Sequence, residues 1–178
     1  MTLMQEMPQT ACLPNVVTYS ALIGACERGR KWELALLAFK EIKLNKMEPD
    51  VITYCAALAA CARGQQWVIA CSMLQSMLHE RISADVVVYN AMLNCGEKAS
   101  QWEASLAVFQ AMREMKIMPN VLSCNLLMSA CEKSHRWEHT LALLSEVHLH
   151  MVEANAITFI SSMNACGKHS GWEDALVL

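Results

Sequence analysis

Residues 16–50 read VVTYSALIGACERGRKWELALLAFKEIKLNKMEPD, and the same 35-residue pattern returns until the chain ends. Tryptophan is its clearest marker, because all five tryptophans stand 35 residues apart: Trp32, Trp67, Trp102, Trp137 and Trp172. A fixed period of ~20–50 residues is typical of solenoids, in which each unit buries its apolar face only by stacking on its neighbours. Function is therefore expected in whatever repeats along one face.

Two helices are predicted in each repeat, which makes the fold an all-α solenoid. Each repeat follows an Asn or Asp, a strong N-cap whose side-chain oxygen accepts an otherwise unpaired backbone N–H. The first helices are therefore expected to begin directly after these caps, at Val16, Val51, Val86, Val121 and Ala156. The second helices are expected to begin at the tryptophans, where apolar residues recur every three or four positions.

The period also predicts the domain organisation. Four full repeats are expected at residues 16–50, 51–85, 86–120 and 121–155, with a truncated fifth at 156–178 and the tail of an earlier repeat at 1–15. A solenoid needs polar caps at its ends, and neither end offers one. The sequence is therefore interpreted as part of a longer array.

Composition excludes several classes of protein. The chain is 54% hydrophobic and 17% charged, but no apolar run approaches the ~18–20 residues of a membrane span. The first residues lack the features of a secretory or organellar targeting segment. Four cysteines share one phase of the repeat, too far apart for disulfides, and are expected to be buried thiols in a reducing compartment: Cys26, Cys61, Cys131 and Cys166.

Catalytic and metal-binding signatures are missing from the sequence. It contains no CxxC pair, no glycine-rich phosphate loop and no nucleophile elbow. His135 and His139 straddle a predicted turn without a third ligand, and His148 and His150 point to different sides of a helix. The expectation is a non-enzyme without cofactor, metal or small-molecule substrate. The tryptophans are interpreted as packing between helix pairs, with stacking on nucleic-acid bases as the alternative.

The repeat resembles the pentatricopeptide repeat family, whose units are 35 residues long. The segments that carry the resemblance are VTYSALI (17–23), Pro49-Asp50, ITY (52–54) and VYNAM (88–92), and the register holds along essentially the whole chain. The resemblance implies a right-handed superhelix of stacked antiparallel helix pairs, with the first helices lining a concave groove. In that family each unit holds one base of single-stranded RNA.

The resemblance also implies which residues read a base: the fifth residue of a repeat together with its last. The pairs are Ser20 with Asp50, Cys55 with Asp85, Asn90 with Asn120, and Asn125 with Asn155. The family's rough code makes the first pair a guanine reader and the last two pyrimidine readers. Cys55 departs from the pattern because a thiol is a poor hydrogen-bond partner, and Ile160 cannot read a base edge. Capping alone also explains the terminal Asn and Asp residues, so both interpretations stay open.

The resemblance also implies two sets of RNA-contacting residues, each at one position of successive repeats. Aliphatic residues expected to sandwich the bases are Val17, Ile52, Val87, Leu122 and Ile157. Basic residues expected to meet phosphate are Arg28, Arg63, Lys98, Lys133 and Lys168. A cation at a helix C-terminus is also favoured by the helix dipole, which needs no RNA.

The implied function is sequence-selective binding of single-stranded RNA in organellar RNA metabolism (stabilisation, processing or translation), in a mitochondrion or plastid. The net charge of −3 opposes it, because affinity for a phosphate chain comes largely from cations. Five glutamates are expected on the outer, second helices: Glu33, Glu103, Glu138, Glu146 and Glu173. The alternative is a protein-binding scaffold or structural subunit of a large organellar complex, such as a mitochondrial ribosome or a respiratory or photosynthetic assembly.

Overall fold

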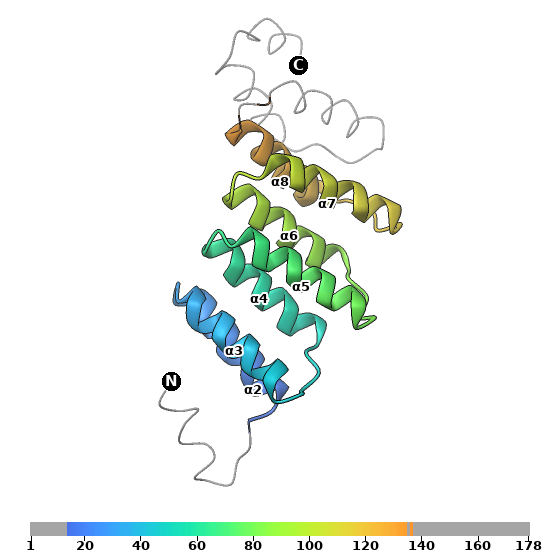
Figure 1. Ribbon diagram of the computed structural model, residues 1–178. Coiled ribbons are helices and arrows are strands. Elements are labelled where there is room, and N and C mark those ends of the chain that lie inside the picture. The colour runs from blue at the N-terminus through green and yellow to red at the C-terminus, as the bar shows by residue number, and fades with distance from the viewer. Residues whose placement is uncertain (1–13, 135, 137–178) are drawn as a thin grey trace, which may run out of the picture. The chain divides into compact units, whose positions relative to one another are not determined.

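Seven α-helices make up the computed structural model, which describes residues 14–134 and residue 136 (Figure 1). They are α2 (Val16–Arg28), α3 (Trp32–Leu44), α4 (Val51–Arg63), α5 (Trp67–His79), α6 (Val86–Lys98), α7 (Trp102–Glu114) and α8 (Val121–Lys133). Each begins at the residue that the sequence predicts, which confirms an all-helical fold of paired helices. Residues 1–13 of the expected tail, Asn155, the fifth repeat and the paired histidines lie outside the described residues.

The first helices begin where side chains cap them. Asn15 and Asn120 each accept the backbone N–H three residues on, at 3.0 Å, and complete a capping box with the hydroxyl of that residue. Asp50 accepts from the backbone of Thr53 at 2.8 Å, and Asp85 accepts from two backbone N–H groups. The second helices within the described residues, α3, α5 and α7, have no side-chain cap. The caps are therefore specific to the first helices.

Equivalent turns join the helices in successive repeats. Residues after the first helices adopt the left-handed conformation (Arg30, Gln65 and Ser100), as do those after the second helices (Lys46, Arg81 and Lys116). The next backbone N–H reaches back over the helix end, as in the 2.8 Å bond from Lys31 to the carbonyl of Cys26, which is a Schellman-type ending. Gly29, which directly follows α2, has a negative φ of −75°.

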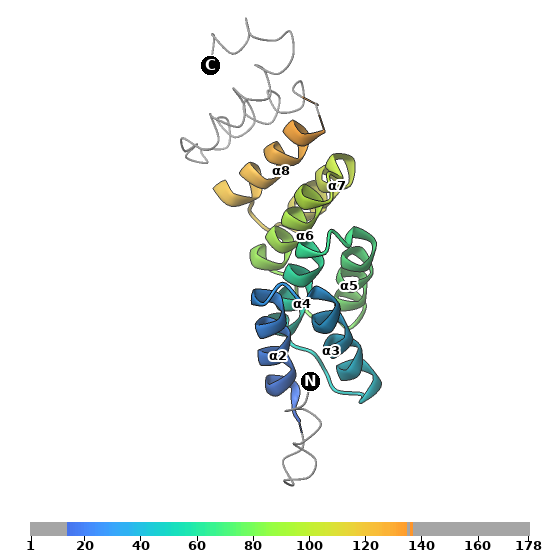
Figure 2. The ribbon, with the colours of Figure 1, turned by 90° about the vertical axis from the view of Figure 1, so that its left-hand side faces the viewer.

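Two compact units divide the chain between Ser83 and Ala84. In the first, α2 contacts α3 and α4, and α4 also contacts α3 and α5. In the second, α6, α7 and α8 contact one another. Within each unit the first helices form one layer and the second helices another, as Figure 2 shows. None of the described helices has the length and hydropathy of a membrane span.

Apolar side chains between the two layers form the core of each unit. Tyr54 and Leu58 are fully buried in the first unit. In the second, Leu93, Leu127 and Met128 are fully buried beside Phe109. These positions recur with the helical repeat, so stacking buries the same phases each time.

Two cysteines of the shared phase are core residues. Cys61 and Cys131 are thiols with no exposed surface. Burial raises the pKa of Cys131 to about 11, which keeps it protonated and unreactive at neutral pH. Both confirm the predicted buried thiols, whereas Cys26 is partly exposed and Cys166 lies outside the described residues.

Trp32 and Trp102 pack between helix pairs, as predicted. The Trp32 indole lies so close to Gly64 of the next repeat that a Cβ on Gly64 would stand 2.5 Å from Cδ2 of the ring. In the second unit the guanidinium of Arg136 lies 5.1 Å from the centre of the Trp102 ring. Trp137 and Trp172 lie outside the described residues.

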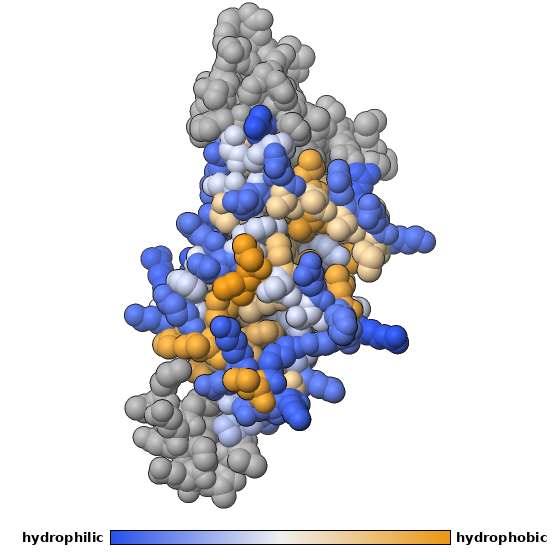
Figure 3. All heavy atoms as spheres, in the orientation of Figure 1, coloured by the Kyte–Doolittle hydropathy of each residue, from blue (hydrophilic) through white to orange (hydrophobic). Residues whose placement is uncertain are grey.

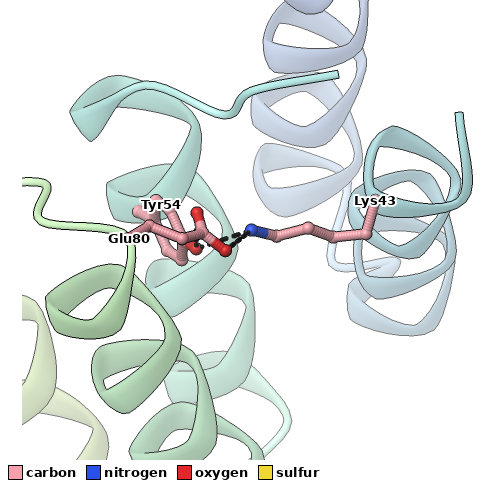
Figure 4. Close-up of polar contacts among 3 residues, drawn as sticks. All are labelled: Lys43, Tyr54 and Glu80. Atoms are coloured by element: carbon pink, nitrogen blue, oxygen red, sulfur yellow. Dashed lines mark hydrogen bonds and ion pairs between the residues drawn. The ribbon is translucent and has the colours of Figure 1, made fainter. Parts of the chain in front are cut away.

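A polar cluster ties the two repeats of the first unit together (Figure 4). Lys43 of α3 donates to the Tyr54 hydroxyl at 2.9 Å and forms an ion pair with Glu80, which follows α5. The Tyr54 hydroxyl in turn donates to Glu80 at 3.0 Å. Tyr19, one repeat earlier, interacts with two residues of its own repeat, Asn45 at 3.5 Å and Glu41. The hydroxyl of Tyr54 is therefore a specific inter-repeat contact.

Replacing Tyr54 with phenylalanine is expected to lower the free energy of unfolding by about 1 kcal/mol, the usual value of a lost hydrogen bond. The Lys43–Glu80 ion pair remains, which limits the loss. Tyr89→Phe is the matched control, because the buried Tyr89 forms no hydrogen bond with another described residue. Urea unfolding of both variants measures the difference. Equal losses would show that the cluster adds nothing to stability.

Candidate RNA-binding face

The first candidate pair meets through a residue of the next repeat. Ser20 is the fifth residue of α2, and Asp50 is the N-cap of α4. Thr53 Oγ1 donates to Asp50 Oδ1 at 2.6 Å and also lies against Ser20 Oγ. Hydrogen bonds from the Thr53 hydroxyl and backbone lower the pKa of the exposed Asp50 and outweigh its slight desolvation, so the carboxylate is charged at neutral pH. The structure thus brings Ser20 and Asp50 into one hydrogen-bonded chain.

In the second unit the candidate pair is in direct contact. Asn90 Nδ2 donates to Asn120 Oδ1 at 3.3 Å. Ser123 Oγ lies 2.6 Å from Asn90 Oδ1 and 3.0 Å from Asn120 Oδ1. Asn90 is largely buried, whereas Asn120 is exposed. A ligand would therefore contact this pair mainly through the Asn120 side chain.

In the other two candidate pairs, the two residues are not both described within one unit. Cys55 is a partly exposed residue of α4, and Asp85 caps α6 in the second unit. Asn125 is a partly exposed residue of α8, and its partner Asn155 lies outside the described residues.

Capping leaves one polar atom of each terminal residue available. Asp50 caps through Oδ1, and its Oδ2 forms no hydrogen bond with a described residue. Asn120 caps through Oδ1, which leaves Nδ2 as a donor. Because the cap fixes which atom turns inward, Asp presents an acceptor and Asn presents a donor at the same place. Capping and base reading are thus compatible functions of one side chain.

An aliphatic side chain stands exposed at the second position of every described first helix. Val17 is 72% and Ile52 is 70% exposed in the first unit, and Val87 is 55% and Leu122 is 53% exposed in the second. Each directly follows the residue after the cap, so it adjoins a candidate pair. Packing within the repeats does not account for this row. Ile157 lies outside the described residues.

The basic row ends the first helices, but acidic residues accompany it. Arg63 forms an ion pair with Glu27 of the preceding repeat, and Lys133 forms one with Glu97 at 2.5 Å. Arg28 is exposed, and no described residue forms an ion pair with it. Glu33 and Glu103 lie exposed on second helices, as expected. The sequence analysis expected acidic residues on the second helices and did not include Glu27 and Glu97, which lie on first helices. Lys168 lies outside the described residues.

Glu97 is the buried member of this network, with only 8% of its side chain exposed. Ser129 donates to its Oε1 at 3.2 Å, and its Oε2 forms an ion pair with Lys98 at 3.2 Å without hydrogen-bond geometry. Burial by itself would raise the pKa of Glu97, but Lys133 and Lys98 outweigh it, so the pKa is lowered. Glu97 therefore carries its negative charge among the cations expected to meet phosphate.

Stability should depend on pH through Glu97. Because its folded pKa is below the ordinary 4.5, its stabilising contribution is present above that value and is lost as the pH falls through the folded pKa. Glu97→Gln is expected to melt a few degrees below wild type at pH 7, with the gap closing toward pH 3. Thermal melts across this range measure it. A gap that is unchanged at pH 3 would contradict the assignment.

Comparison with known families decides the identity of the fold. The PPR repeat family matches residues 14–63 and 84–131, more than half of the chain. The chain belongs to the pentatricopeptide repeat family. No curated protein sequence matches this pentatricopeptide repeat chain.

Solved pentatricopeptide repeat structures share the fold at low sequence identity. PPR10 from maize has a TM-score of 0.85 at 18% identity, over 99% of this chain and 25% of that one. PPR10 in complex with an 18-nt psaJ RNA element has a TM-score of 0.80 at 18% identity, over 99% and 26%. The PPR domain of Arabidopsis thaliana protein-only RNase P 1 in complex with tRNA has a TM-score of 0.73 at 10% identity, over 88% and 84%. The chain thus spans about a quarter of PPR10.

Four residues beside the candidate pairs and basic positions were not predicted from the sequence: Glu27 and Thr53 in the first unit, and Glu97 and Ser123 in the second. Glu27 and Glu97 each stand one residue before a basic position. Thr53 and Ser123 each stand three residues after a cap. Both phases are visible in the sequence, but the contacts with a residue one repeat away depend on how neighbouring first helices pack.

Proposed function

We propose that this chain binds single-stranded RNA selectively by sequence, with one base per repeat on the face formed by the first helices. The exposed aliphatic row beside the polar pairs is the observation that carries this proposal. When a flat base covers an exposed apolar side chain, apolar surface is removed from water and the free energy of the complex is lowered. The likeness to PPR10, a protein solved with an RNA element, supports the proposal.

The polar pairs would supply the selectivity. Ser20 and the outward Oδ2 of Asp50 suit the N1–H and amino donors of guanine. Asn90 with Asn120, and Asn125 with Asn155, are proposed to read pyrimidines. Cys55 with Asp85 is proposed to be a weak reader, since a thiol is a poor hydrogen-bond partner.

The basic residues would contact phosphate, but the acids beside them reduce their effect. Glu27 and Glu97 form ion pairs with Arg63, Lys98 and Lys133. Each phosphate contact must compete with these pairs, so we expect modest affinity from this chain. Further repeats would be needed for a tight, specific site.

The cellular process is proposed from the family. Pentatricopeptide repeat proteins typically act in organelles, which favours RNA stabilisation, processing or translation in a mitochondrion or plastid. The partner is then RNA, and no small-molecule substrate, metal or cofactor is proposed.

A second candidate function is a scaffold that binds another protein of a large organellar complex. The outer helix α5 favours it, because α5 contains no Asp, Glu, Lys or Arg and exposes Val68 and Leu78. Orange, apolar residues also reach the surface among polar ones in Figure 3. Exposed apolar surface of this kind suits a protein partner.

Filter binding across a salt series separates the two functions. RNA oligonucleotides would carry one guanine in a pyrimidine tract, or an adenine in its place. Affinity that falls steeply between 50 and 200 mM salt and depends on the base is the expected result. Absence of binding, or binding indifferent to base identity, would contradict selective RNA recognition and favour the scaffold.

A further inference from the structure

We propose that the hydroxyl at the third position of a first helix, Thr53 or Ser123, is a positioning residue for base selectivity in the preceding repeat. The inference rests on the proposed function and adds to it. The reading pair would then be a triad, whose third member belongs to the next repeat. Its hydroxyl decides which atoms of the pair face the base.

In the first unit the triad is Ser20, Thr53 and Asp50. The single proton of Thr53 goes to the Asp50 carboxylate at 2.6 Å, the stronger acceptor. Ser20 Oγ then has two inward acceptors for its proton, Thr53 Oγ1 and the carbonyl of Val16 at 2.8 Å. Because the hydroxyl protons of Thr53 and Ser20 both point inward, Ser20 Oγ and the Asp50 carboxylate each offer an acceptor to the base.

In the second unit Ser123 holds a different pair in the same way. Its hydroxyl donates to Asn90 Oδ1 at 2.6 Å, and its backbone N–H donates to Asn120 Oδ1 at 3.0 Å. Asn90 Nδ2 also donates to Asn120 Oδ1. Both carbonyl oxygens are thus turned inward, and the protons that remain belong to the two amide groups. This triad presents donors, where the first presents acceptors.

Capping alone does not explain these hydroxyls. A capping box needs contact only between the third residue and its own cap, as between Thr18 and Asn15. Ser123 and Thr53 also reach residues 33 positions earlier, in the preceding repeat. Both side chains are fully buried, so neither hydroxyl is open to bulk solvent. The same contact occurs independently in two units with different polar partners.

The chain itself shows that the fold tolerates loss of this hydroxyl. Val88 occupies the third position of α6 and is fully buried, while Asp85 still caps that helix. Thr53→Val copies this natural arrangement and keeps the side-chain shape. It therefore removes the hydroxyl without opening a cavity. Thr53→Ser retains the hydroxyl and is the matched control.

The test in the first unit compares two RNAs that differ only by guanine or adenine opposite Ser20 and Asp50. Wild type and Thr53→Ser are expected to prefer guanine roughly tenfold, the value of one good polar contact. Thr53→Val is expected to reduce this preference to about twofold or less, with circular dichroism reporting an intact fold. Full guanine preference in Thr53→Val would overturn the inference.

A measurement without RNA separates this inference from the proposed function. In the free protein, Ser123→Ala is expected to shift the side-chain amide resonances of Asn90 and to accelerate their hydrogen exchange, whereas Ser123→Thr restores both. Unchanged Asn90 resonances in Ser123→Ala would overturn the triad even if wild type binds RNA. Altered resonances in a chain with no base preference would instead overturn the proposed function and, with it, the reading role of the triad.

Discussion

Replacing Gly64 with alanine is expected to destabilise the protein by roughly 1–3 kcal/mol, the usual cost of overpacking. The new Cβ would stand 2.5 Å from Cδ2 and 2.8 Å from Cε3 of Trp32, well inside contact distance. The indole must move from its place between the two repeats. Gly64 has a φ of −86°, which alanine adopts easily, so the clash with Trp32 is the expected cause.

Gly24→Ala is the matched control for this prediction. A Cβ on Gly24 would come no closer than 3.5 Å to Arg28, and Gly24 lies inside α2, where alanine is the better helix former. Its free energy of unfolding should stay equal or rise. In a Trp32→Ala background Gly64→Ala should cost much less, because the clash is gone. Denaturant unfolding of the four variants measures this, and an undiminished cost in that background would contradict the packing account.

Replacing Ile52 with aspartate is expected to weaken RNA binding about tenfold or more, since it removes a surface for one base and adds charge repulsion toward phosphate. The fold should be unaffected. Ile52 is 70% exposed, and aspartate in the first turn of α4 is favoured by the helix dipole. Binding and folding are therefore separable at this residue.

Val68→Asp provides the control for Ile52→Asp. Val68 is 79% exposed and is the second residue of α5, as Ile52 is the second residue of α4. Both substitutions add one negative charge, but Val68 belongs to a second helix. Fluorescence anisotropy with one RNA should show a large loss for Ile52→Asp and a small one for Val68→Asp. Equal losses would mean that net charge governs binding and that the aliphatic row does not.

The sequence predicted the helices closely because each boundary depends on local chemistry. The caps Asn15, Asp50, Asp85 and Asn120 act within three residues of themselves. The tryptophan phase likewise marks the start of each described second helix. Because the period is fixed, the same local interactions set the helix boundaries in each repeat.

The polar contacts of the candidate face were less predictable because they join repeats. The pairing of Glu27 with Arg63 spans 36 residues, and the Ser123–Asn90 bond spans 33. Such offsets depend on the stagger between neighbouring first helices, which periodicity alone does not supply. The sequence shows which residues occupy equivalent positions of the repeat. Which residues of neighbouring repeats they contact is decided by how the helices pack.

The Asp50→Asn variant tests base reading by these repeats most directly. Asp50 caps α4 through Oδ1, and asparagine can cap in the same way, so the variant exchanges an outward acceptor for a donor. Affinity should be measured for two RNAs that differ only in a guanine or an adenine at one base. Wild type should prefer guanine roughly tenfold, and Asp50→Asn should shift toward adenine. An identical binding profile for the two proteins would show that Asp50 is a helix cap and reads no base.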